Sequence, residues 1–434
     1  MRDIALVVIV LGVILVIFRY PWIGALAYAW VSIFVPHRWA FGFANDMPIA
    51  MIVAVTTLAS MMLHPKQVRL PINRITVLLM LLPIWMTVTL FFALEPDEAY
   101  VRWVEVMKVF FFTLVTASLV HSRKQLEALL WVLVLSVGFY GVKGGIFTIL
   151  EGGAYRVYGP PGASALADNG AIALASVMMI PLMFYLAGVV TSKWVKAGLL
   201  GAILLSGMTV LGSQSRGAFL AIMAITVFLW VKGRRKLIFG LALVALVSLG
   251  IGFMPDSWTA RMETIRTYEQ DGSAMGRVNT WWMLFNLAND RPLVGGGFEP
   301  YSPRQFSRYA PDPLDVHSAH SIYFQILGEH GYVGFALFLC FGIVSWNMAG
   351  WLVKASRERS DSVWVGDLAR AIQVSFVGFA VGGAFFNMAY WEMAYYEAVI
   401  LMAAYRLVGA GPKPNPAITL PPRPPVSRRI PQRF

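Results

Sequence analysis

GAFLAIMAITVFLWV-KGRRK-LIFGLALVALVSLGIGFM, residues 217–254, decides the fold class. Two apolar runs, Gly217–Val231 and Leu237–Met254, flank a five-residue segment in which four residues are basic. Each run is close to the length that an α-helix needs to cross about 30 Å of hydrocarbon. Basic residues in a short loop between such runs are typical of the cytoplasmic side of a membrane. The stretch therefore predicts two membrane-spanning helices joined on the inside.

Similar apolar segments recur along the whole chain, without the alternating pattern of a barrel, so helices are the only expected spanning structure. The short runs Ile4–Phe18 and Trp22–Val35 are either two crossings or one crossing plus an interfacial piece. The other predicted spans are Pro48–Leu63, Ile75–Leu94, Trp103–Val120, Leu126–Leu150, Asn169–Val190, Ala197–Gly212, Tyr332–Val353, Ala371–Tyr390 and Met393–Leu407. We predict an all-α polytopic membrane protein with about 12 transmembrane helices and one large periplasmic loop region.

The composition supports this class. Of the 434 residues, 58% are hydrophobic and 13% are charged, whereas a soluble domain carries roughly 25% charged residues. These values exclude a soluble enzyme, a disordered chain and a nucleic-acid-binding domain. We therefore attribute the net charge of +12 to basic loops that face anionic membrane lipid, and we expect no nucleic acid as partner.

The orientation follows from the short loops that hold most of the basic residues. Placing the Lys232–Lys236 loop inside puts four other basic loops inside as well, whereas the facing loop Glu95–Arg102 has one arginine against three acids. The basic residues of those four loops are Lys66, Arg69, Arg74, Arg123, Lys124, Lys193, Lys196, Lys354, Arg357, Arg359 and Arg370. The longest polar stretch, Pro255–Ser321, then lies outside, which is the periplasm for a bacterial inner membrane.

Four regions follow from this topology. Residues 1–254 are predicted to form an N-terminal helix bundle, residues 255–320 a periplasmic loop, and residues 321–410 the C-terminal helices. Residues 411–434 hold eight prolines and five basic residues without an acidic side chain. This composition predicts a disordered cytoplasmic tail.

The periplasmic loop has an uneven set of ionisable residues. It contains two histidines and no lysine. Its six arginines are Arg261, Arg266, Arg277, Arg291, Arg304 and Arg308. Guanidinium is a planar fork that matches two phosphate oxygens at once, although ordinary ion pairing with the loop's eight acids is the alternative. Arg216, between Gly212 and Gly217 at the junction of two helices, is either a functional residue or part of a structural ion pair.

Four short motifs on this predicted outer face resemble a known family. His320-Ser321, nine residues and Gly331-x-x-Gly334 resemble the His-containing element of the O-antigen ligase and polymerase superfamily. The remaining three are Gly276-Arg277-x3-Trp281, Pro292-Leu293-x-Gly295-x-Gly297 and Ser215-Arg216-Gly217. The segments Gly141–Phe147 and Tyr158–Gly162 are similar to a narrower branch, the O-glycosylation ligases found alongside exosortase systems.

The resemblance implies glycosyl transfer from undecaprenyl diphosphate to an acceptor hydroxyl. His320 is the expected general base, because a histidine near neutral pKa can take the hydroxyl proton. Arg216 and Arg277 are the expected diphosphate ligands, with Arg156 and Arg291 in second rank. His317 and Asp315 are possible supporting residues, and His317 is an alternative base. We expect one-step inversion, no metal and no cofactor.

The acceptor stays open at the level of the sequence. We favour an O-antigen ligase acting on the lipid A–core oligosaccharide, with a polymerase or a protein O-glycosylation ligase as alternatives. A transporter or flippase for lipid-linked glycan is the alternative from a different class. Its candidate ionisable groups are Glu105, Lys108 and Lys143, of which the first two can pair on one helix.

Overall fold

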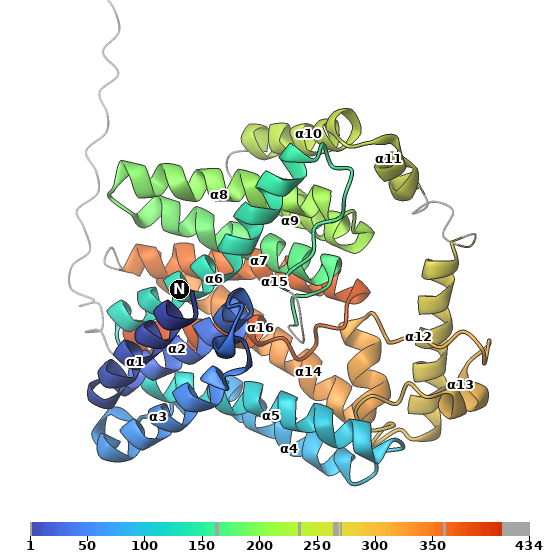
Figure 1. Ribbon diagram of the computed structural model, residues 1–434, viewed down its shortest axis with the longest axis horizontal. Coiled ribbons are helices and arrows are strands. Elements are labelled where there is room, and N and C mark those ends of the chain that lie inside the picture. The colour runs from blue at the N-terminus through green and yellow to red at the C-terminus, as the bar shows by residue number, and fades with distance from the viewer. Residues whose placement is uncertain are drawn as a thin grey trace, which may run out of the picture.

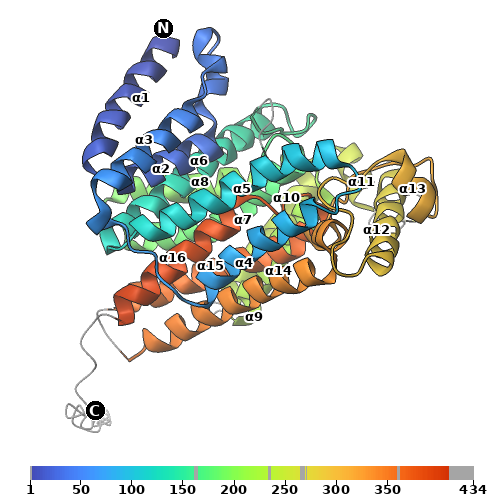
Figure 2. The same cartoon turned by 90° about the horizontal axis from the view of Figure 1, so that it is seen from below.

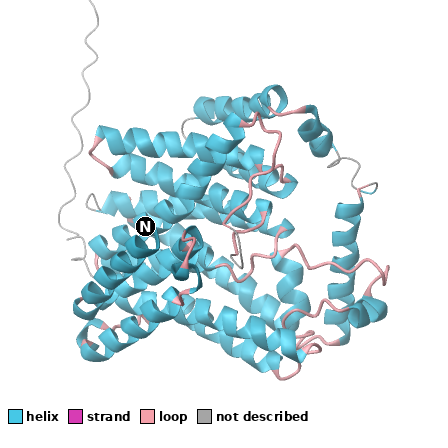
Figure 3. Cartoon of the chain, viewed as in Figure 1, coloured by secondary structure: helices cyan, strands magenta, loops and turns pink. Residues whose placement is uncertain are grey.

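The computed structural model describes residues 2–160, 165–232, 236–263, 269, 271–358 and 362–409. The predicted disordered tail 411–434 lies outside the described residues, as do residues 233–235 of the basic loop and residues 161–162 of the branch-like segment. In the described part of the chain the regular elements are all helices (Figure 3). The α-helices are α1 (Arg2–Arg19), α2 (Pro21–Phe34), α3 (Ile49–Leu63), α4 (Arg74–Leu90), α5 (Pro96–Leu119), α6 (Arg123–Leu150), α7 (Asn169–Val189), α8 (Lys193–Gly212), α9 (Arg216–Lys232), α10 (Lys236–Phe253), α11 (Asp256–Glu263), α12 (Gly272–Asp290), α13 (Pro303–Tyr309), α14 (Ile322–Ala355), α15 (Val363–Gly382) and α16 (Glu392–Gly409).

Each apolar run predicted from the sequence forms a helix, which confirms the all-α class. The two short N-terminal runs form separate helices, because Pro21 begins α2 at the first helical position, where its missing N–H costs nothing. Among the described helices, five are long and apolar enough to cross a membrane: α6, α7, α8, α14 and α15 with the turn that follows it. The count of about twelve crossings remains a prediction.

The C-terminal helix α16 is buried along nearly its whole length, including two glutamates. Glu392 accepts a hydrogen bond from Ser32 on α2, and Glu397 accepts one from Ser375 on α15, each at 2.5 Å. A helix that is buried all round lies in the centre of a bundle. These carboxyl groups are therefore internal ties between helices far apart in the sequence.

About half of the predicted loop 255–320 is helical, since it contains α11, α12 and α13. In Figures 1 and 2, α12 and α13 lie at one end of the bundle, and α12 stands across the direction of the long helices. One face of α12 buries Met283, Leu284 and Leu287 in a small core with Phe306 and Ala319. This core lies outside the main helix packing, so the region folds as a cap at the end of the bundle.

Two of the three ionisable residues that a transporter would use, Glu105 and Lys143, have local partners. Glu105 bonds Arg102 at 2.7 Å rather than Lys108, and half of its side chain is exposed. The Lys143 ammonium lies 4.3 Å from the centre of the Trp39 ring, a cation–π contact that stabilises it locally. These contacts give structural roles to Glu105 and Lys143.

Candidate functional site

Arg216 is the first residue of α9, directly after a tight turn that ends α8. Gln214 in this turn has a positive φ of 53°, and its amide nitrogen donates to the Gly153 carbonyl at 3.1 Å. Asn169 at the start of α7 donates to the Ser213 carbonyl at 2.8 Å. The start of α9 is thereby fixed beside the start of α7.

The two glycines that flank this junction are packed closely against other helices. A Cβ added to Gly212 would lie 1.9 Å from the Thr148 hydroxyl oxygen, and one added to Gly217 would lie 2.7 Å from Phe385 Cβ. Real Cβ atoms do not approach other atoms so closely, so both positions need glycine.

The structure places Arg216 in a forked ion pair with Asp271. The two contacts, Nη1–Oδ2 and Nη2–Oδ1, are 2.6 and 3.4 Å long, and both side chains are less than one-fifth exposed. Asp271 also caps α12 by accepting a hydrogen bond from the Ala274 N–H at 3.0 Å. Arg216 therefore forms an ion pair that joins the N-termini of α9 and α12, and its role in binding a ligand stays a prediction.

Arg277 lies in the second turn of α12, close to this pair. Burial lowers its pKa, the positive charges of Arg216 and Arg261 lower it further, and the carboxylates of Asp168 and Asp271 oppose them. Arginine remains protonated in proteins even so. In the described part of the chain its guanidinium forms no ion pair or hydrogen bond. The fork of Arg277 is thus available to a ligand.

Arg261 is a member of the cluster that sequence reasoning did not select. It lies on α11, which is held against the end of α8 by a 3.1 Å hydrogen bond from the Trp258 indole to the Leu211 carbonyl. Burial lowers the Arg261 pKa, followed by the charges of Arg156 and Arg216. Arg156, which is exposed, therefore lies near Arg261 at the edge of the same positive region.

The loop that carries His320 is held by α12. The Asn279 amide donates to the carbonyls of Asp312 and Asp315 at 2.9 and 3.0 Å. The Trp281 indole donates to the Ala319 carbonyl at 2.7 Å. Trp281 follows Arg277 by four positions, about one helical turn, so both lie on one side of α12. The arginine and the histidine loop are therefore placed by the same helix.

His320 has a left-handed backbone, with φ at 44°. Such a conformation is uncommon for a non-glycine residue and is often found at functional sites. Burial, together with the positive charge of Arg277, lowers its pKa to about 4, while Asp168 opposes this shift. This pKa differs from the near-neutral value expected from the sequence, because burial disfavours the charged ring. The imidazole is consequently neutral at neutral pH and has a lone pair with which to accept a proton.

His317 has a different partner. Its Nε2 lies 2.7 Å from the Asp315 carboxylate, and both side chains are more than one-third exposed. A Cβ added to Gly276 would lie 2.6 Å from the His317 ring, so glycine at the start of the Gly-Arg-x3-Trp motif lets this pair pack on α12. Asp315 therefore orients His317 rather than His320.

The remaining motifs meet at a kink in α14. Gly331 interrupts this helix with φ 67° and ψ −171°, a conformation that is essentially restricted to glycine. The Gly296 and Gly297 N–H groups donate to the carbonyls of Gly328 and Glu329 at 2.8 and 2.9 Å. The glycine turn and the His-x9-Gly element thus form one structural unit.

Arg291 belongs to this unit and not to the arginine cluster. It follows α12 at the end opposite Arg277, about 21 Å away along the helix by its rise per residue. Its Nη2 donates to the Phe92 carbonyl at 2.6 Å. The structure therefore brings together Arg216, Arg277, Arg261 and His320, and leaves Arg291 apart.

A buried polar network beside the kink was not found from the sequence. The Tyr390 hydroxyl bonds the Glu329 carboxylate and lies 2.8 Å from His330 Nε2. Glu329 also accepts a hydrogen bond from Tyr301 at 3.1 Å, and His330 Nδ1 lies 2.7 Å from the Thr89 hydroxyl. The partners come from four segments distant in sequence, which is why no local pattern indicated them.

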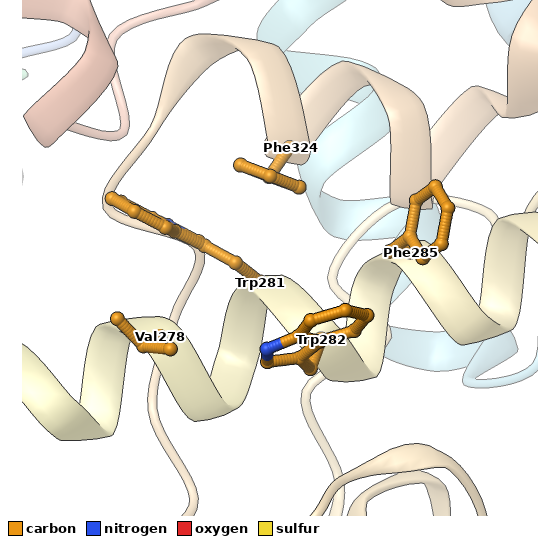
Figure 4. A pocket seen from close by; sticks show the side chains of 5 residues that line it. All are labelled: Val278, Trp281, Trp282, Phe285 and Phe324. Carbon is orange, nitrogen blue, oxygen red and sulfur yellow. The ribbon is translucent and has the colours of Figure 1, made fainter.

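An apolar pocket lies farther along α12. Val278, Trp281, Trp282, Phe285 and Phe324 line it, with a volume of about 310 Å³ (Figure 4). The rings of Trp281 and Phe324 are stacked at 5.2 Å. Because Trp281 also holds the His320 loop, this pocket borders the site. Within the described residues, no group of three or more His, Cys, Asp or Glu side chains is arranged to hold a metal ion.

Helix N-termini meet around these residues. Asp168 caps α7, Arg216 begins α9, Asp271 caps α12, and His320 lies two residues before α14. Helix N-termini carry partial positive charge and attract anions. Arginines, helix ends and a neutral imidazole together can hold a diphosphate and accept a proton beside it.

Comparisons with known families agree with this chemistry. Residues 1–191 match a family of unknown function (DUF5935), and residues 201–339 match the family described as O-Antigen ligase. No protein with a curated description matches the chain. The second match contains Arg216, Arg277 and His320, and such domains are associated with glycosyltransferase-like ligases. Residues 201–339 are thus similar to O-antigen ligases, and the several apolar helices of the described chain support a multi-pass membrane protein.

Proposed function

We propose that the protein is an O-antigen ligase of lipopolysaccharide biosynthesis. It would transfer a glycan from undecaprenyl diphosphate to a hydroxyl of the lipid A–core oligosaccharide, at the periplasmic face of the bacterial inner membrane. The observation that carries this proposal is the meeting of four helix N-termini with Arg216, Arg277 and the neutral His320. A lipid-linked diphosphate is the ligand whose charge fits such a site.

The proposed transfer is one displacement at the anomeric carbon. The bond from this carbon to the diphosphate oxygen breaks, and its electron pair leaves with the diphosphate. The acceptor oxygen forms the new bond, and its proton passes to the His320 imidazole. Attack opposite the leaving group inverts the anomeric configuration.

The arginines would stabilise the leaving group. Negative charge grows on the diphosphate as the bond breaks, and fixed positive groups aimed at that charge lower the barrier. The free fork of Arg277 is the first ligand in this scheme, and Arg216 is the second. Arg261 and Arg156 are placed to add charge at the rim. This arrangement needs no metal or cofactor.

The apolar pocket supports a lipid-linked donor. It begins one residue after Arg277 on α12 and is lined by aromatic and aliphatic side chains. A donor with a charged head and an apolar chain would find both environments within two turns of one helix. A free sugar nucleotide would have no use for the apolar part.

A reconstituted transfer assay tests the proposal. The full chain in lipid nanodiscs is mixed with undecaprenyl-diphosphate-linked glycan and lipid A–core, and products are separated on gels. We expect the His320→Asn variant to lose transfer, because asparagine tolerates the left-handed backbone but cannot act as the base. The matched His317→Asn variant is expected to keep it. The opposite pattern would show that His317 is the base.

Repeating the assay with other acceptors distinguishes the ligase from related activities. Product with a second lipid-linked glycan alone would identify a polymerase, and product with a protein hydroxyl alone would identify a ligase of the exosortase-associated type. Movement of the lipid-linked glycan across the membrane without any transfer product would refute the enzyme and favour a flippase. Activity that requires a divalent metal would refute the metal-free mechanism.

A further inference from the structure

A basic pocket lies at the end of the bundle opposite His320. Its volume is about 410 Å³, and its lining residues are Arg69, His121, Tyr405, Arg406, Leu407 and Gly409. Arg69 precedes α4, His121 follows α5, and the other four belong to the last turns of α16. The sequence predicts this end of the bundle to face the cytoplasm.

The Arg406 guanidinium is held in place by neutral groups. Its Nη1 lies 2.9 Å from His121 Nδ1 and 3.3 Å from the Arg69 carbonyl oxygen. His121 Nε2 lies 3.0 Å from the Gln67 carbonyl oxygen. A carbonyl only accepts and a guanidinium only donates, so the histidine proton is on Nε2 and Nδ1 accepts from Arg406. The ring therefore positions the arginine without neutralising it.

The charge of the two arginines is not balanced locally. Neither Arg69 nor Arg406 forms an ion pair with any described carboxylate. The side chain of Arg69 bonds only the Lys66 carbonyl, at 3.3 Å. Burial and the two nearby arginines lower the pKa of His121, which agrees with a neutral ring. The pocket thus presents two cationic forks and no anion.

The following segment of the chain cannot supply that anion from its side chains. Residues 411–434 carry five basic side chains and no acidic one. Like charges repel, and no carboxylate of the described residues pairs with these two arginines, so we look for the counter-ion outside the polypeptide. The Tyr405 ring packs on Trp351 at 4.8 Å, and such aromatic residues are enriched at the level of lipid headgroups.

We propose that this pocket binds a phosphate group supplied by an anionic lipid headgroup of the cytoplasmic leaflet. Guanidinium forks match phosphate oxygens two at a time, and basic pockets between transmembrane helices on this side bind anionic headgroups. Because Arg406 lies in the last turn of α16 and Arg69 precedes α4, the bound headgroup joins the central helix to a peripheral one. This role is separate from glycan transfer and requires no donor or acceptor.

Lipid retention measures the proposal directly. The full chain is purified from nanodiscs of phosphatidylcholine with phosphatidylglycerol, and retained lipid is identified by native mass spectrometry. The Arg69→Gln/Arg406→Gln variant is expected to retain phosphatidylglycerol roughly tenfold less than the unmodified chain, since charge-assisted bonds are lost. The matched Lys193→Gln/Lys196→Gln variant removes two charges at the same end, outside the pocket, and should retain the lipid normally.

Thermal unfolding separates the possible outcomes. We expect phosphatidylglycerol, compared with pure phosphatidylcholine, to raise the unfolding temperature of the unmodified chain and of the lysine variant, but not of the arginine variant. Equal unfolding temperatures of all three in pure phosphatidylcholine show that the arginine variant is folded. Equal retention by both double variants would overturn the proposal. Stabilisation by inorganic phosphate with none by phosphatidylglycerol would refute the lipid source.

Discussion

The depressed pKa of His320 predicts an acid limb of the pH–rate profile far below that of an ordinary histidine. Only a neutral imidazole can take the proton of the acceptor hydroxyl, so the rate should follow the fraction of His320 that is neutral. Burial beside Arg277 lowers the pKa to about 4, whereas an unperturbed histidine titrates near about 6.5. Activity should therefore persist as the pH falls through 6 and decline only near pH 4.

The size of the effect can be worked out at about pH 5.5. With a pKa of about 4, about 97% of His320 is neutral there, against about 9% for an unperturbed histidine. The two cases differ about tenfold in rate, which a transfer assay resolves easily. Replacing Arg277 by glutamine removes one cause of the shift, so the acid limb of its residual activity should move upward in pH.

The assay is the pH dependence of kcat/KM, because this ratio reports ionisations of the free enzyme. Folding must be controlled over the same range. The unfolded chain binds the His320 proton near pH 6.5 and the folded chain only near pH 4, so stability is lost as the pH falls between these values. Rates are therefore measured after brief acid exposure, with recovery of activity at pH 7 as the control. An acid limb centred near pH 6.5, with full recovery, would refute a buried neutral base.

Three further substitutions test the site and its support. Arg216→Lys keeps the charge but loses the fork, so we expect kcat/KM to fall between about tenfold and about a hundredfold. The control is Arg308→Lys, which should change kcat/KM little because both side chains of its ion pair are more than 40% exposed. Near-normal turnover by Arg216→Lys would remove the argument for a forked contact. Gly331→Ala places a Cβ 2.4 Å from the Leu293 carbonyl oxygen at positive φ, and should destabilise the protein by about 1–3 kcal/mol or more in thermal unfolding. Gly342→Ala in the same helix meets no atom within 4 Å and serves as its control, and equal unfolding temperatures would contradict the role of the kink. Tyr390→Phe leaves Glu329 and His330 without their shared hydroxyl and should cost at least about 1–3 kcal/mol, whereas an unchanged unfolding temperature would show that the network adds no stability.

The helical architecture could be predicted well because the apolar runs are long and uninterrupted. Every predicted run became a helix, and Pro21 explains why the two N-terminal runs remain separate. The helices inside residues 255–320 were missed because their apolar faces are short. Met283, Leu284 and Leu287 bury themselves against residues of the same cap, which only the folded arrangement reveals.

The site was partly predictable because its motifs are local. Arg277 and Trp281 share one motif, and a helical reading places them on one side. Arg261 was not singled out because its place depends on the anchoring of α11 by Trp258. Asp168 was missed for the same kind of reason, since it is an ordinary helix cap in sequence. Arg291 fits a motif, but that motif supports the kink at Gly331 and lies apart from the arginine cluster.

If Arg216 binds the diphosphate as proposed, its ion pair with Asp271 makes that binding an exchange of anions. Any anion that takes the fork of Arg216 must first displace the carboxylate that occupies it at 2.6 Å. A singly charged ion replaces one negative charge by another and gains little, whereas a diphosphate brings excess charge and can bridge to the free fork of Arg277. Under the proposed function, the Asp271 carboxylate would therefore favour multivalent anions over singly charged ones. That exchange would take place at the cap of the helix whose Trp281 holds the His320 loop, so one helix would position both the anion and the proposed base.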